Sequence, residues 1–208
     1  MKLYTSKGAA NPRRVVMFLA EKGVRDIPTV EVNLLAGEHE SPEYRSVNPL
    51  ARVPALELDD GRILCESRAI CTYVEGLHPD PNLMGRSAEE RAFIEMWDRR
   101  VEWHFFLPVA MWVRHSHPAL VSLEQLQLPD YARTQEARTR ETARWLDSEL
   151  AERRYVAGER FTIADITAFV ALEFARLVKF RAGEAGLPHL HRWREEMVAR
   201  PSASASSY

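Results

Sequence analysis

Residues 53–64 read VPALELDDGRIL, and this stretch indicates the architecture of the first part of the chain. Apolar residues alternate on both sides of Asp59-Asp60-Gly61. An Asp-Gly pair between two alternating runs is a strong signal for a β-hairpin. We therefore expect two antiparallel strands joined by a tight turn.

The residues before this hairpin predict a strand, a helix and a second strand. Residues 1–4 alternate like a short strand, and residues 29–34 alternate again. Between them, Asn11 suits a helix N-cap, Pro12 suits the first helical position, and Gly23 suits the C-terminal end. Such a unit has a right-handed crossover and parallel strands.

A helix is expected directly after the hairpin, because Glu66-Ser67 precedes apolar residues at helical spacing, and Ser67 suits the cap. The order is then βαβ followed by ββα, which is the arrangement of a thioredoxin-like α/β domain. We assign this domain to residues 1–79. The Pro79-Asp80-Pro81-Asn82 cluster predicts a linker, placed at residues 80–87.

Residues 88–208 are expected to form an all-α domain, a helical bundle, because strand signals vanish and apolar residues recur at helical spacing. Thr162, with Asp165 three residues later, resembles a capping box. The run that follows is nearly all apolar, as in a helix at a domain centre. The last residues, 202–208, are small and polar and are expected to fray.

The bulk composition favours small molecules or proteins as partners. The 28 Lys and Arg nearly balance the 30 Asp and Glu, so no net attraction to nucleic acid or an anionic membrane is expected. No apolar run reaches the ~20 residues of a membrane helix, and the start lacks a signal-peptide pattern, so we expect a cytoplasmic protein. Cys65 and Cys71 have the spacing of neither a disulfide framework nor a zinc site, and no metal is expected.

Five segments together resemble the cytosolic glutathione transferases. They are residues 11–23, 37–39, 48–56, 66–70 and 161–165, in the expected order over nearly the whole chain. Within that family the chain is most similar to the fungal and bacterial transferases related to the second yeast enzyme, and next to the phi and theta classes. The resemblance implies a homodimeric detoxification enzyme. Such an enzyme uses glutathione as co-substrate, needs no cofactor and acts on a small hydrophobic electrophile.

The resemblance also implies which residues bind glutathione. A cis proline at Val53-Pro54 would turn the backbone N–H and C=O of Val53 outward, where a peptide ligand can pair with them. Ser67 and the adjacent helix start would hold the γ-glutamyl carboxylate, and Glu66 the ammonium. His39 and Arg52 would form charge-assisted hydrogen bonds to the glycyl carboxylate.

The group that activates the thiol is left open by the sequence. Holding glutathione as a thiolate with a pKa lowered by ~2 units requires about 2.7 kcal/mol of preference for the anion. Relatives use a Tyr, Ser or Cys in the first loop, whereas this loop reads Gly8-Ala9-Ala10-Asn11. The candidates are Ser6, Asn11 with the helix N-terminus beside it, and His115, which aligns with a histidine of the yeast-like subgroup and could hold a water.

Two other functions compete with conjugation. Transferase-like folds also serve as non-catalytic interaction modules, such as the stringent-starvation protein, and the missing first-loop hydroxyl favours this alternative. A glutathione-dependent disulfide reductase would need a first-loop Cys, which is absent. Large side chains of the α domain could line an electrophile pocket or belong to the core; they are Trp103, His104, Phe106, Met111 and Trp112.

Overall fold

The computed structural model describes residues 1–205, and contacts divide the chain into two compact units. The first unit contains residues 1–81 together with the segment that begins at Pro201, and the second contains Asn82–Arg200. The expected helical domain extended to the end of the chain, so the assignment of the last helix to the first unit departs from that expectation.

The first unit contains a four-stranded sheet in the order β2-β1-β3-β4. The strands are β1 (Lys2–Thr5), β2 (Thr29–Glu31), β3 (Ala55–Glu57) and β4 (Ile63–Cys65). β1 runs parallel to β2, with Leu3 opposite Thr29, and antiparallel to β3, with Leu3 opposite Leu56. β3 and β4 form the antiparallel hairpin. The predicted βαβ and ββα order is therefore confirmed.

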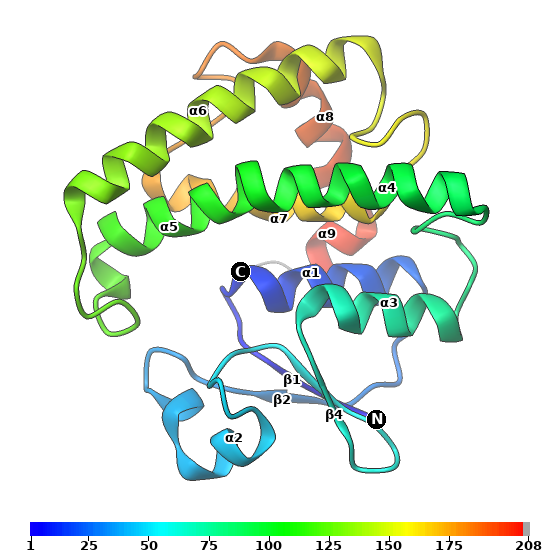
Figure 1. Ribbon diagram of the computed structural model, residues 1–208, viewed down its shortest axis with the longest axis vertical. Helices are drawn as coiled ribbons and strands as arrows, with labels where there is room; N and C mark the ends of the chain where they lie inside the picture. Colours follow the sequence, from blue (N-terminus) through cyan, green and yellow to red (C-terminus); the bar gives the residue numbers. More distant parts are fainter. Residues whose placement is uncertain (206–208) are drawn as a thin grey trace. The chain divides into compact units, whose positions relative to one another are not determined.

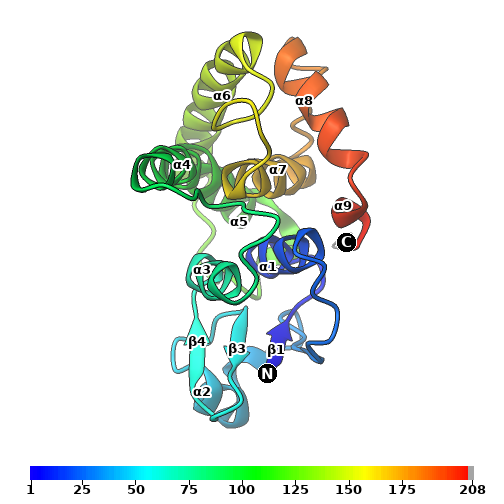
Figure 2. The same ribbon diagram turned by 90° about the vertical axis from the view of Figure 1, so that its right-hand side faces the viewer.

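Two helices of the first unit, α1 (Ala10–Glu21) and α3 (Ser67–Leu77), lie side by side on one face of the sheet (Figures 1 and 2). Each presents an apolar stripe, with Phe18 and Ile70 fully buried. A 3-10 turn (Glu38–Glu40) and the short helix α2 (Pro42–Val47) lie away from these two helices. This arrangement puts the starts of α1 and α3 near each other.

Both predicted N-caps are wrong by one or two residues. Ala9 is the N-cap of α1, so Asn11 lies in the first turn. Glu66 is the N-cap of α3, so Ser67 is its first helical residue. Neither Asn11 nor Ser67 bonds to the N–H groups of its own helix, because the two side chains bond to each other.

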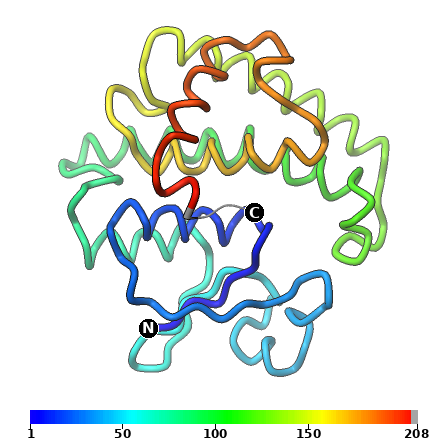
Figure 3. Tube along the Cα trace, turned by 180° about the vertical axis from the view of Figure 1, so that it is seen from behind, coloured from blue at the N-terminus to red at the C-terminus, as the bar shows by residue number. Residues whose placement is uncertain are grey.

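The end of the described chain is helical rather than frayed. Helix α9 (Pro201–Ala205) packs along α1, as the tube in Figure 3 shows. Ser202 is buried and donates a hydrogen bond from its hydroxyl to Glu21. The rest of the segment that was expected to fray, residues 206–208, lies outside the described residues.

The second unit is all helical, as expected. Helix α4 (Ala88–Val101) continues through a π-helical turn (Glu102–Phe106) into α5 (Leu107–Ser116), which Figure 1 shows as one long rod. The other elements are α6 (Pro129–Glu152), α7 (Ile163–Ala175), α8 (Pro188–Val198) and two 3-10 turns, Pro118–Leu120 and Arg176–Val178. Helix α7 packs against both α4 and α5, and its residues are buried on nearly every side, which confirms the predicted central helix.

The predicted capping box at the start of α7 is confirmed. Asp165 Oδ2 accepts a hydrogen bond from the Thr162 N–H at 2.9 Å. Its Oδ1 accepts from the Val156 N–H at 2.9 Å and from Trp193 Nε1 at 3.0 Å. Burial raises the pKa of this fully enclosed carboxyl to about 6. Asp165 therefore joins the preceding loop, α7 and α8 at one point.

Candidate functional site

Ser67 links the starts of α3 and α1. Its Oγ donates to Asn11 Oδ1 at 3.2 Å and accepts from Arg14 Nη1, also at 3.2 Å. Ser67 is 5% exposed and Arg14 is completely buried. The hydroxyl is thus held from both sides, and a positive charge lies behind the first turn of α3.

Sequence reasoning missed Arg14. It lies three residues after Asn11, and residues three apart share one face of a helix. This spacing from Asn11 could have indicated that Arg14 lies near the site. An arginine on an amphipathic helix is normally expected to be solvent-exposed, however.

Glu66 has a strained backbone at the start of α3. Its φ of 66° lies in the region that favours glycine, with a ψ of 116°. Such conformations cost on the order of 1–3 kcal/mol and concentrate at ligand sites. The side chain is exposed, so a carboxylate stands at the start of α3.

The loop before β3 leaves the backbone groups of Val53 open. The Val53-Pro54 bond is cis, as expected. The carbonyl of Arg52 accepts from the Tyr44 hydroxyl and from Asn48 Nδ2, both at 2.7 Å, so the loop is fixed from behind. Within residues 1–205, neither the N–H nor the C=O of Val53 has a hydrogen-bond partner. Both groups are left for a ligand in an extended conformation.

The two expected partners of the glycyl carboxylate differ in exposure. His39 lies on the 3-10 turn and is 6% exposed, with its Nε2 3.5 Å from Glu40 Oε1. Its Nδ1 is buried and has no hydrogen-bond partner among the residues that the structure describes. An unsatisfied buried polar atom costs about 1–3 kcal/mol, which a ligand contact would recover. Arg52 is exposed, and its Nη1 lies 3.4 Å from the carbonyl of Ala51.

The first-loop candidates for thiol activation lie at the N-terminal end of α1. Ser6 follows β1, is 6% exposed, and its carbonyl accepts from the Ala9 N–H at 3.3 Å. Asn11 is exposed, and the first turn of α1 contains no acidic side chain. Because Asn11 Oδ1 accepts from Ser67, its Nδ2 is left as a donor. An anion at this end of α1 would meet that donor and the positive end of the helix dipole.

His115 lies in the second unit, near the end of α5, and is 9% exposed. Its Nδ1 accepts from the Leu128 N–H at 3.3 Å, and its ring packs edge-on against Tyr131 at 5.0 Å between centroids. These contacts tie α5 to the residues around the start of α6, a structural role that the sequence did not reveal. With Nδ1 as an acceptor, the neutral ring carries its proton on Nε2.

Four of the five large side chains considered for an electrophile pocket separate into two groups, and the fifth, Met111, is half-buried. Trp103 and His104 line a cavity of about 470 Å³ in the second unit, together with Trp145. Phe106 and Trp112 are each 6% exposed and belong to the core.

Residues 1–205 contain no group of three or more His, Cys, Asp or Glu side chains that could hold a metal ion. No helix in the same range is both long enough and apolar enough to span a membrane.

Two family models match the chain. Residues 3–82 match the N-terminal domain of glutathione S-transferase, and residues 104–201 match its C-terminal domain. Among curated proteins, glutathione S-transferase 2 of Saccharomyces cerevisiae is 35% identical over 97% of this chain and 87% of its own length. Glutathione S-transferase GstA of Escherichia coli O157:H7 is 30% identical over 97% of this chain and 94% of its own length.

Solved structures agree with these matches. Gtt2 of Saccharomyces cerevisiae superposes with a TM-score of 0.92 at 35% identity, over 98% of this chain and 99% of the other. A glutathione S-transferase domain-containing protein of Marinobacter aquaeolei gives a TM-score of 0.88 at 40% identity, over 97% and 99% of the two chains.

Proposed function

Since the chain belongs to the glutathione S-transferase family, we propose that it binds glutathione in its first unit and transfers the thiolate to a small hydrophobic electrophile. The observation that carries this proposal is the open backbone of Val53 beside a fixed loop, in the same unit as the start of α3, where Ser67 and the exposed Glu66 lie. A short peptide with a free carboxylate at each end is the ligand that this arrangement suits.

The proposed binding mode assigns each part of glutathione to one element. The backbone N–H and C=O of Val53, fixed by Pro54, pair with the cysteinyl residue as an added strand edge. Ser67 and the N–H groups of α3 hold the γ-glutamyl carboxylate, and Glu66 holds the ammonium. His39 and Arg52 hold the glycyl carboxylate, where a buried Nδ1 with no partner within residues 1–205 supports the first of these two.

The proposed chemistry needs the sulfur as an anion. Asn11 Nδ2, the N-terminus of α1 and the hydroxyl of Ser6 are the groups that would stabilise it, and the helix dipole alone supplies roughly 0.3–1 kcal/mol. His115 would donate from Nε2 to a water that in turn donates a hydrogen bond to the thiolate, and the thiol proton would be released to the solvent. The thiolate then forms a bond to the electrophilic carbon, and with an aryl or alkyl halide the halide leaves with the electron pair of the broken bond.

The proposal extends to a cytoplasmic homodimer that removes toxic electrophiles. The dimer is supported by exposed apolar side chains along one helical rod of the second unit, Phe93, Trp103 and Leu107. If analytical ultracentrifugation at micromolar concentration gave the mass of one protomer, the homodimer would be excluded. Neither nucleic acid nor a membrane is part of the proposal.

Calorimetric titration with glutathione, followed by turnover assays with a panel of aryl halides, alkyl halides and peroxides, tests the function. We expect saturable binding, and conjugation of at least one halide. Binding without turnover of any electrophile would favour the non-catalytic interaction module instead, a specific alternative because residues 8–11 lack the Tyr, Ser or Cys that relatives use in the first loop. No binding at millimolar glutathione would overturn the proposal.

A further inference from the structure

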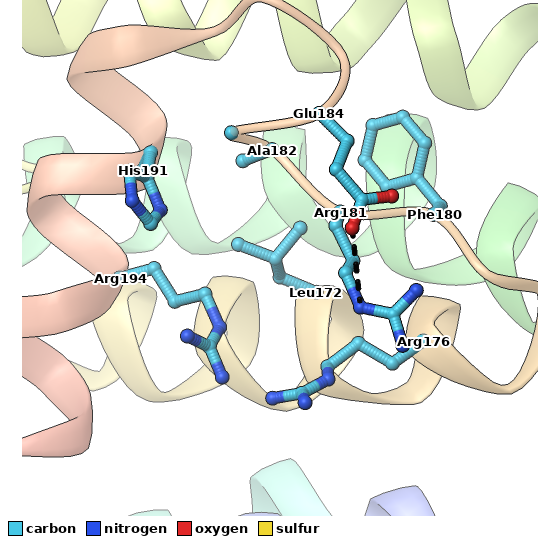
Figure 4. Close-up of a pocket in the computed structure, with 9 residues that line it drawn as sticks. Leu172, Arg176, Phe180, Arg181, Ala182, Glu184, His191 and Arg194 are labelled. Atoms are coloured by element: carbon cyan, nitrogen blue, oxygen red, sulfur yellow. Dashed lines mark ion pairs between the residues drawn. The ribbon is translucent and has the colours of Figure 1, made fainter.

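The arginines of this protein differ in what their guanidinium groups contact. In the second unit, three of them line a cavity of about 290 Å³, and each forms an ion pair with a glutamate (Figure 4). They are Arg176, Arg181 and Arg194, with Glu173, Glu184 and Glu195 as their partners. The positive charge of this cavity is therefore balanced by carboxylates of the chain itself.

Arg14, in the first unit, instead donates to a neutral hydroxyl. Its side chain is completely buried, and its Nη1 lies 3.2 Å from Ser67 Oγ. Helix α1, which carries Arg14, packs against α3, which begins at Ser67 (Figures 1 and 2). The packing of two helices therefore holds the guanidinium against the hydroxyl, and neither side chain is free to turn into solvent.

The chemistry of arginine determines the direction of this hydrogen bond. A guanidinium only donates, whereas a serine hydroxyl has one proton to donate and two lone pairs that accept. Because Arg14 occupies one lone pair of Ser67, the hydroxyl proton has to point toward a different group. In the free protein that group is Asn11 Oδ1, at 3.2 Å. Arg14 therefore sets Ser67 to act as a donor.

We propose that Arg14 is a positioning residue that makes the glutathione site select a carboxylate at the γ-glutamyl end of the ligand. The inference rests on the proposed function, in which Ser67 holds that carboxylate. A carboxylate oxygen only accepts hydrogen bonds and is negatively charged, so it is a stronger acceptor than the amide oxygen of Asn11 and takes the Ser67 proton. The guanidinium behind the hydroxyl strengthens this bond, because linked hydrogen bonds polarise one another in a buried site.

Calorimetry with two ligands tests the proposal. One is glutathione, and the other is its analogue with a carboxamide in place of the γ-glutamyl α-carboxylate. The wild type should bind glutathione at least about tenfold more tightly than the amide. Arg14→Met removes the donor but keeps an unbranched side chain, and it should lower this preference at least about fivefold. A role in stability alone would weaken both ligands equally and leave the ratio of their affinities unchanged.

The matched control is Arg62→Gln, which changes an exposed arginine beside the hairpin turn and should keep the wild-type ratio. A double-variant cycle shows whether Arg14 acts through Ser67. Ser67→Ala should lower the preference by a similar factor, and Arg14→Met combined with Ser67→Ala should lower it no further, because both residues serve one hydrogen bond to the ligand.

If Arg14→Met does not fold, Arg14→Gln takes its place. The glutamine amide oxygen can accept the Ser67 proton and compete with the ligand, so the preference should fall here too. An unchanged ratio in the arginine variant that folds, or a double variant that loses several-fold more preference than Ser67→Ala alone, would overturn the inference and leave the proposed function standing. A wild type that binds no glutathione would overturn both.

Discussion

Ser67 Oγ, in the first turn of α3, donates a 3.2 Å hydrogen bond to Asn11 Oδ1, in the first turn of α1. The bond joins the residue proposed to hold the γ-glutamyl group to a residue proposed to stabilise the thiolate. It also leaves the Nδ2 side of the Asn11 amide as a donor. The proposed ligand binding and the proposed thiol activation therefore share one hydrogen-bonded pair.

Ser67→Ala should weaken glutathione binding by about tenfold, because one hydrogen bond to a charged group is lost and Asn11 loses its partner. Calorimetry measures the change. The matched control is Ser46→Ala, which removes an exposed hydroxyl bonded only to the carbonyl of Glu43. Equal affinities for the Ser67 variant and the wild type would show that the γ-glutamyl group binds elsewhere.

Glu66→Gly should separate stability from binding. Glycine adopts a φ of 66° without steric cost, so we expect the free energy of unfolding to rise by up to about 1 kcal/mol. Glutathione affinity should fall, because the carboxylate proposed to hold the ammonium is gone. Glu66→Gln keeps the strain and should lose affinity without gaining stability. Urea denaturation and calorimetry report the two quantities, and a Glu66→Gly protein less stable than Glu66→Gln would contradict the account.

Asp165 should make stability depend on pH. Its folded pKa of about 6 exceeds the ordinary value of 3.8, so the folded state binds the proton more tightly than the unfolded state does. The stability that this proton contributes is complete below the ordinary pKa and is lost as the pH rises through about 6. Relative to Asp165→Asn, which cannot titrate, the wild-type free energy of unfolding should fall by about 2 kcal/mol from pH ~4 to pH ~7.

Urea denaturation of the wild type and of Asp165→Asn at several pH values checks this, since all other titrating groups are common to both. A difference between the two proteins that stays constant with pH would show that the carboxyl titrates normally in the folded state.

His115→Asn tests the proposed water site separately from the structural contact. Asparagine can supply an acceptor near the position of Nδ1 for the Leu128 N–H but has no group at Nε2. We expect the melting temperature to stay near that of the wild type and kcat to fall at least about tenfold, with little change in glutathione affinity. Unchanged kcat and pH–rate profile would leave His115 with its structural role alone.

The parts of the fold that local sequence signals specify were predictable. The hairpin at Asp60-Gly61 and the capping box of Thr162 and Asp165 both depend on residues close in the chain, and both are present. The cap assignments failed because Ser67 and Asn11, 56 positions apart, bond to each other in preference to their own helices.

The residues proposed for the site could be named from the sequence, but the hydrogen bonds among them could not. The buried position of Arg14 depends on the packing of α1 against α3, and the helix at residues 201–205 depends on packing against α1. Neither contact has a local pattern in the sequence. The second partner of Ser67 and the structural contact of His115 were missed for the same reason.

The pKa of the bound glutathione thiol, followed by thiolate absorbance during a pH titration, tests the central claim most directly. In the wild type we predict a pKa about two units below that of free glutathione. In Asn11→Ala it should return at least halfway toward the free value, with glutathione still bound. A bound thiol that titrates like free glutathione in the wild type would contradict the account.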